Sequence, residues 1–137
     1  MLKVHGVLET ALYVKNVKRS AEFYRQLFDF TVLLESERLI ALNVVDRSVL
    51  LLFKEGATKE PLMTSGGIIP GHAGTGSHHL AFSISSEDVV SWQQRLEAQG
   101  VNIESIVQWP GGAQSIYFRD PDEHLIELMS PGFWSIY

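Results

Sequence analysis

Hydrophobic and polar residues alternate in short stretches along the chain, and these stretches fall into two similar sets. In the first set, residues 7–14 alternate with the period of a strand. Residues 17–28 place apolar side chains at helical spacing between Asn16, a typical helix cap, and Asp29, which ends the predicted helix. Three more short strands are predicted, over residues 31–34, 39–45 and 49–53.

The second set repeats this order. Residues 78–84 alternate as a strand, a polar run at residues 85–88 precedes a helix through Trp92, and Gly100 ends that helix. Three strands follow, over residues 102–107, 114–119 and 124–129. Because a repeated pattern indicates repeated structure, we predict an α+β fold in which two βαβββ modules form a cupped mixed β-sheet.

We expect one domain over residues 1–137, made of module 7–54 and module 78–130. The connection between them, residues 55–77, is rich in glycine and has no clear period. So long a connection in a small domain is typical of a functional cover or a linker between modules. His72 lies in it and could reach over the cup as an acid or base, although loop histidines more often face water.

Laying one module over the other gives equivalent strand positions that carry candidate chemistry. Glu9 is the counterpart of His79, and Leu51 is the counterpart of Glu127. One imidazole and two carboxylates on the inner face of a curved sheet suit a divalent ion such as Fe(II), Mn, Co, Ni or Zn. The alternative is that each glutamate is solvated or paired with an arginine, for which Arg38 and Arg119 are candidates.

Other aromatic and imidazole residues are weaker candidates. Tyr13, Trp109 and Trp134 could form an aromatic wall for a planar ligand, or they pack in the core or at a dimer contact. His78 points to the face opposite His79 and is expected to be structural. By the same alternation, His124 is expected at the surface.

Composition narrows the possible partners. The chain has 11 Lys and Arg against 16 Asp and Glu, a net charge of −5, and no basic stripe, which argues against nucleic acid. It has no cysteine, so disulfides, thiolate nucleophiles and Cys-ligated metal sites are excluded. No apolar stretch is long enough to span a bilayer, and no signal peptide is apparent, so we expect a cytoplasmic protein.

Three motifs resemble the vicinal oxygen chelate superfamily, which includes glyoxalase I, extradiol dioxygenases, fosfomycin-resistance proteins and bleomycin-binding proteins. The resemblance runs from about residue 7 to residue 130. It is carried by Leu-Glu-Thr-Ala-Leu-Tyr-Val from residue 8, His-Leu-Ala-Phe from residue 79, and Tyr-Phe-Arg-Asp-Pro from residue 117 ending in Ile-Glu-Leu. It implies Glu9, His79 and Glu127 as metal ligands, with Glu9 in a place that more often holds His or Gln.

The resemblance also bears on the reaction. The extradiol dioxygenases share the run of Tyr117, Asp120-Pro121 and Glu127, which implies Tyr117 and Glu127 as catalytic residues. A catalytic histidine expected upstream of the tyrosine is missing, which disfavours ring cleavage with O2. Leu51 replaces a glutamate common in glyoxalase I relatives, which argues against glyoxalase I itself.

Two functions therefore stay open. The first is a metal-dependent lyase, isomerase or oxygenase (dioxygenase-like) acting on a small substrate with vicinal oxygens. The second is a non-catalytic, bleomycin-resistance-like protein that binds an antibiotic or another small molecule. In either case we expect a homodimer, because a half-open cup with an aromatic tail leaves apolar surface to bury.

Overall fold

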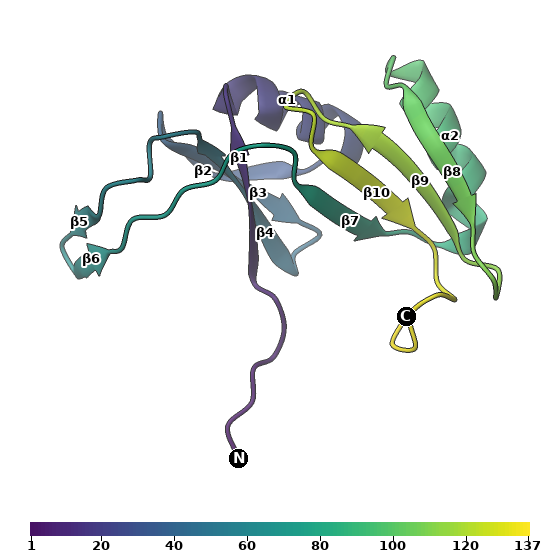
Figure 1. The fold of residues 1–137 in the computed structure, drawn as a ribbon, viewed down its shortest axis with the longest axis horizontal. Helices are drawn as coiled ribbons and strands as arrows, with labels where there is room; N and C mark the ends of the chain where they lie inside the picture. The colour runs from purple at the N-terminus through teal and green to yellow at the C-terminus, as the bar shows by residue number, and fades with distance from the viewer. The chain divides into compact units, whose positions relative to one another are not determined.

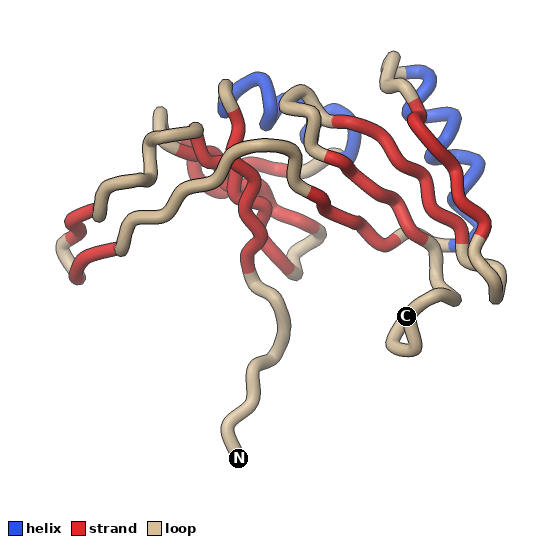
Figure 2. Tube along the Cα trace, viewed as in Figure 1, coloured by secondary structure: helices blue, strands red, loops and turns tan.

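The computed structural model describes residues 1–137, which form two compact units, Met1–Thr75 and Gly76–Tyr137. Each unit is built around a four-stranded sheet with a helix against it (Figures 1 and 2). None of the helices is both long enough and apolar enough to cross a membrane.

The first unit has the predicted order of one strand, one helix and three strands. Its strands lie in the order β1-β4-β3-β2; β1 and β4 run parallel, and the other pairs run antiparallel. The elements are β1 (Glu9–Val14), α1 (Val17–Phe28), β2 (Thr31–Glu35), β3 (Leu39–Val44) and β4 (Ser48–Lys54).

Local chemistry sets the ends of α1. The side chain of Asn16 accepts a hydrogen bond from the backbone N–H of Arg19 at 3.0 Å, as predicted for a cap. Asp29 adopts a left-handed conformation, and its N–H bonds to the carbonyl of Arg25. Between these ends the helix buries Tyr24 and Leu27. The helical period in the sequence therefore gives the face that packs on the sheet.

The second unit repeats the topology of the first. Its strands lie in the order β7-β10-β9-β8, again with the first pair parallel and the others antiparallel. The elements are β7 (His79–Ser83), a 3-10 turn η1 (Ser86–Asp88), α2 (Val89–Ala98), β8 (Ile103–Gln108), β9 (Gln114–Arg119) and β10 (Leu125–Met129). Two mixed sheets in two similar modules confirm the predicted fold class.

Two features differ from the sequence prediction. The glycine-rich connection contains a small hairpin, β5 (Leu62–Thr64) with β6 (Gly67–Ile69), whose strands are too short to show a period. His124 is fully buried rather than at the surface. Its ring stacks on His78 with centroids 4.5 Å apart, and its Nδ1 accepts the backbone N–H of His78 at 2.9 Å. The turn before β10 rotates His124 inward, which alternation along the strand alone does not predict.

Candidate metal-binding pair and ligand cavity

The strand register supports the equivalence of the candidate residues. Glu9 of β1 lies beside the β4 residue two positions before Leu51. His79 of β7 lies beside the β10 residue two positions before Glu127. Glu9 and His79 therefore occupy the same place in their units, and so do Leu51 and Glu127.

In the second unit, His79 and Glu127 meet. The Nε2 atom of His79 lies 3.2 Å from the Oε1 atom of Glu127, and Glu127 is 6% exposed. The other ring nitrogen of His79, Nδ1, lies 3.0 Å from the carbonyl oxygen of Leu125. A carbonyl only accepts, so Nδ1 carries a proton, and in a neutral imidazole Nε2 then has a lone pair. Two lone pairs that face each other at this distance need a proton or a cation between them.

The distance itself fits a shared metal ion. Two donors that are each about 2.1 Å from one ion, at an angle of about 90–110°, lie about 3.0–3.4 Å apart. The tether from His79 to a backbone carbonyl is also the arrangement that orients metal-ligating histidines. No group of three or more His, Asp or Glu side chains that could hold a metal occurs in the structure. The second unit thus brings two of the three predicted ligands, His79 and Glu127, together.

The remaining oxygen of Glu127 is held by hydroxyl groups. Oε2 accepts hydrogen bonds from Ser115 at 2.5 Å and from Tyr117 at 3.0 Å. Ser115 in turn accepts the indole N–H of Trp109 at 2.8 Å, so its own proton points to the carboxylate. Burial is the largest effect on Tyr117 and raises its pKa. The hydrogen bond with Ser115 comes next and lowers the pKa, and the hydrogen bond and negative charge of Glu127 raise it further, so the net shift is upward. Tyr117 therefore stays protonated at neutral pH and donates to Glu127.

Neither candidate arginine pairs with a predicted ligand. Arg119 binds Glu104 through two nitrogens, at 2.7 and 3.3 Å, and its third contact is the hydroxyl of Ser77 at 3.0 Å. No hydrogen bond or ion pair joins Arg38 to Glu9. No arginine therefore neutralises Glu127 or Glu9, and Glu9 is exposed, as the solvated alternative predicts.

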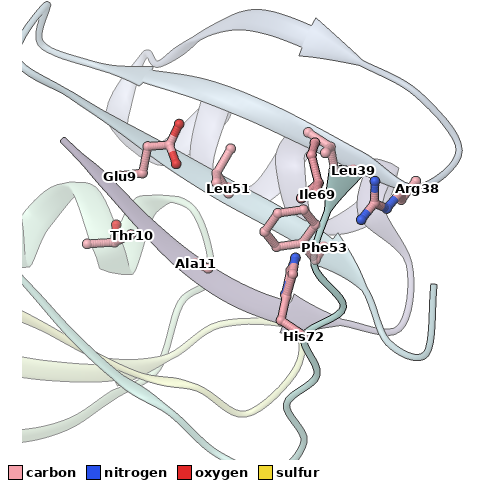
Figure 3. Close-up of a pocket in the computed structure, with 9 residues that line it drawn as sticks. All are labelled: Glu9, Thr10, Ala11, Arg38, Leu39, Leu51, Phe53, Ile69 and His72. Atoms are coloured by element: carbon pink, nitrogen blue, oxygen red, sulfur yellow. The ribbon is translucent and has the colours of Figure 1, made fainter. Parts of the chain in front are cut away.

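Glu9 lies in the first unit, where it lines a cavity of about 380 Å³ (Figure 3). The walls are mostly apolar, formed by Leu39, Leu51, Phe53 and Ile69. Figure 3 shows Glu9 at one end and Arg38 at the other, with the apolar side chains between them. This cavity has the size and lining of a small-molecule site.

His72 also lines the cavity, so the connection does bring it to a candidate site. Its Nδ1 lies 2.6 Å from the hydroxyl of Tyr13, and its ring packs edge-on against Phe53. A side chain at Gly74 would place its Cβ 2.3 Å from the ring of Tyr13, so this close approach of the connection requires glycine. The 55–77 connection is thus packed onto the first unit at this point.

The predicted aromatic wall is divided between the units. Trp109 contacts Phe133 with centroids 4.6 Å apart, and Phe133 contacts Trp134 at 4.9 Å, all in the second unit. Tyr13 instead stacks on Phe53 in the first. Sequence reasoning missed Ser115, whose only signal was its place two residues before Tyr117 on the same strand.

Comparison with known proteins assigns the family. The family model described as the Glyoxalase/Bleomycin resistance protein/Dioxygenase superfamily matches residues 6–128. The chain therefore belongs to this superfamily, which confirms the resemblance seen in its motifs. It is 30% identical to the metallothiol transferase FosB of Bacillus licheniformis, over 92% of this chain and 75% of that protein.

Solved structures agree on the fold. The lactoylglutathione lyase of Agrobacterium tumefaciens has a TM-score of 0.87 and 28% identity, covering 96% of this chain and 98% of that one. The fosfomycin resistance protein FosX of Listeria monocytogenes, solved with Mn(II) and sulfate ion, has a TM-score of 0.70 and 23% identity, covering 96% and 94%. At 23% identity, the similarity to FosX is evidence for the fold alone.

Proposed function

We propose that this protein is a metal-dependent enzyme that acts on a small substrate with neighbouring oxygen atoms. The observation that carries the proposal is the contact of His79 with Glu127, in which an imidazole nitrogen and a carboxylate oxygen lie 3.2 Å apart, the separation of two ligands on one ion. The buried carboxylate lies beside two hydroxyl donors and has no arginine partner. That environment is costly without a cation and favourable with one.

His79 and Glu127 would hold the ion, and Glu9 is proposed as the third ligand because its strand position is equivalent to that of His79. A bound divalent ion supplies Lewis-acid stabilisation of negative charge on a substrate oxygen. Ser115 and Tyr117 keep Glu127 oriented, and Tyr117 can hold a proton beside it. Glu127 and Tyr117 are therefore the proposed catalytic residues.

The relatives suggest which reaction to try first. FosB carries the name metallothiol transferase and FosX the name fosfomycin resistance protein, so transfer of a thiol to fosfomycin is the first candidate reaction. The lyase, isomerase and oxygenase reactions predicted from the sequence are the candidates to test next. The homodimer and the cytoplasmic location stay predictions.

Metal binding is the direct test. Protein purified without chelator is equilibrated with Mn(II), dialysed and measured by elemental analysis. We expect about one ion per chain in the wild type, and at least 100-fold weaker binding in His79→Ala and Glu127→Ala, because each removes a ligand. Glu104→Ala is the matched control, since it removes an exposed carboxylate of the same unit.

The outcome also separates the two functions. Metal content unchanged in both ligand variants would overturn the enzyme proposal and leave the non-catalytic binding protein. If metal binds, the loaded protein is incubated with fosfomycin and cysteine, and the loss of free thiol is followed. Thiol loss that Glu127→Ala abolishes supports the transferase reaction, and no loss with the metal-loaded wild type excludes it.

A further inference from the structure

One charged group in the first unit has an unsatisfied atom beside the cavity. The Nε atom of Arg38 is buried and has no hydrogen-bond partner. The backbone of Arg38 is engaged, because its N–H bonds to Ser36 and its carbonyl accepts from Lys54, so the residue is held in place. A guanidinium donor that is buried and unpaired costs stability, which is unusual unless something else pairs with it.

Glu9 does not neutralise this cation. Glu9 pairs with the β4 residue Val49, whereas the Arg38 carbonyl bonds to Lys54, five residues further along the strand. At about 3.4 Å per residue the two backbone positions are about 17 Å apart along the strand, and no ion pair joins the two side chains. The cavity therefore has two separate polar ends (Figure 3).

The surface between these ends is apolar. Leu39, Leu51 and Phe53 line it, and Ile69 of β6 contributes from the connection. Such a surface favours a hydrocarbon or aromatic portion of a ligand. His72 adds one polar group, whose Nδ1 is engaged by Tyr13.

We propose that this cavity binds a small organic oxyanion, with the anionic group on Arg38 and an apolar body along Leu39, Phe53 and Leu51 toward Glu9. A planar guanidinium matches the oxygens of a carboxylate or phosphate-type group. The inference deepens the proposed function, on which it rests, by naming the substrate class. Arg38 is then the residue that selects for a negatively charged substrate.

Binding of three matched probes tests whether the cavity prefers a small organic oxyanion. We would titrate protein kept in EDTA with 4-phenylbutyrate, which has charge and an apolar body, and with 4-phenylbutan-1-ol, which lacks the charge. Acetate, which lacks the body, is the third probe. Affinities come from ¹H–¹⁵N spectra, in which the amides of Leu39, Leu51 and Phe53 should move. We expect the carboxylate to bind roughly tenfold more tightly than the alcohol, from one charge-assisted contact.

Variants of Arg38 test whether this residue causes the preference for the carboxylate over the alcohol. Arg38→Met keeps much of the aliphatic stem and should weaken phenylbutyrate roughly tenfold while leaving the alcohol unchanged. Arg38→Lys should keep part of the preference, because the charge remains. Arg47→Met is the matched control, since Arg47 is exposed in the β3–β4 turn of the same unit and does not line this cavity. The spectra also report whether each variant is folded.

The proposal is overturned if the carboxylate and the alcohol bind equally, if neither probe moves the cavity amides, or if Arg38→Met retains the preference. Stronger binding of acetate than of phenylbutyrate would also overturn it, because the apolar walls would then contribute nothing. Because these titrations are done without metal, their failure leaves the metal proposal intact. A failure of metal binding at His79 and Glu127 would likewise leave the titration result standing as evidence for a binding protein.

Discussion

The two units have the same topology but carry different chemistry on corresponding strands. Next to Glu127, the neighbouring strand β9 presents Tyr117, while next to Leu51 the strand β3 presents Ala41. Two residues earlier on these strands stand Ser115 in the second unit and Leu39 in the first. The second unit thus surrounds a carboxylate with hydroxyl donors, and the first surrounds a leucine with apolar side chains.

This difference separates what a module needs to fold from what it needs to act. The helix-facing positions are apolar in both units, as Leu50 and Leu52 correspond to Ile126 and Leu128, and all four are fully buried. The opposite face is free to differ, because it does not contact the helix. A repeat can therefore retain its fold while one copy becomes a ligand set and the other a cavity wall.

The largest effect is expected when the first unit is given the carboxylate of the second. Leu51→Glu places the charge beside Ala41 without a hydroxyl donor, and should lower the free energy of unfolding at pH 7 by about 2 kcal/mol. Burial would raise the pKa of the new carboxyl. The decrease in the free energy of unfolding should therefore be complete above the folded-state pKa and should disappear at pH 4, where the carboxyl is protonated.

Urea denaturation at both pH values measures this change. Leu33→Glu is the control, since Leu33 is 56% exposed on β2 and should tolerate the charge. Equal stabilities of the two variants at pH 7 would contradict the contrast between the units.

A smaller effect is expected from removing one hydroxyl in the second unit. Ser115→Ala leaves both the indole N–H of Trp109 and Oε2 of Glu127 without this partner, and should cost about 1.5 kcal/mol of stability. Mn(II) affinity should fall about tenfold, because the carboxylate loses its orientation. Thermal unfolding and metal titration measure the two changes.

Ser105→Ala is the control for that variant, because Ser105 is exposed on β8. An effect on stability without an effect on metal affinity would show that Ser115 serves the fold alone.

The smallest effect concerns Tyr117. Its pKa is raised, so the stability it contributes is present below the ordinary tyrosine value of about 10 and is lost as pH rises through the higher folded-state value. Tyr117→Phe should change stability at pH 8 by less than about 1 kcal/mol. As the pH rises above about 10, the wild type should lose stability more steeply than the variant. Parallel curves for the two proteins across that range would exclude the predicted titration.

Several features of this protein were readable from the sequence alone. The Asn16 cap, the helical period through Tyr24 and Leu27, and the alternation in each strand predict the elements, because local spacing decides which side chains share a face. The internal repeat then gives the topology and the equivalence of Glu9 with His79, since a strand register follows from matching hydrophobic positions.

Tertiary structure decided the rest. Side-chain directions in three dimensions place Ser115 and Trp109 beside Glu127 and turn His124 inward. They also leave both Arg38 and Arg119 unpaired with any of the proposed ligands. The cavity of the first unit is likewise closed by Ile69 and His72, from a connection without any sequence period. Sequence spacing determines which face a residue occupies, but only the packed chain determines which polar atoms meet and which are left to bind something else.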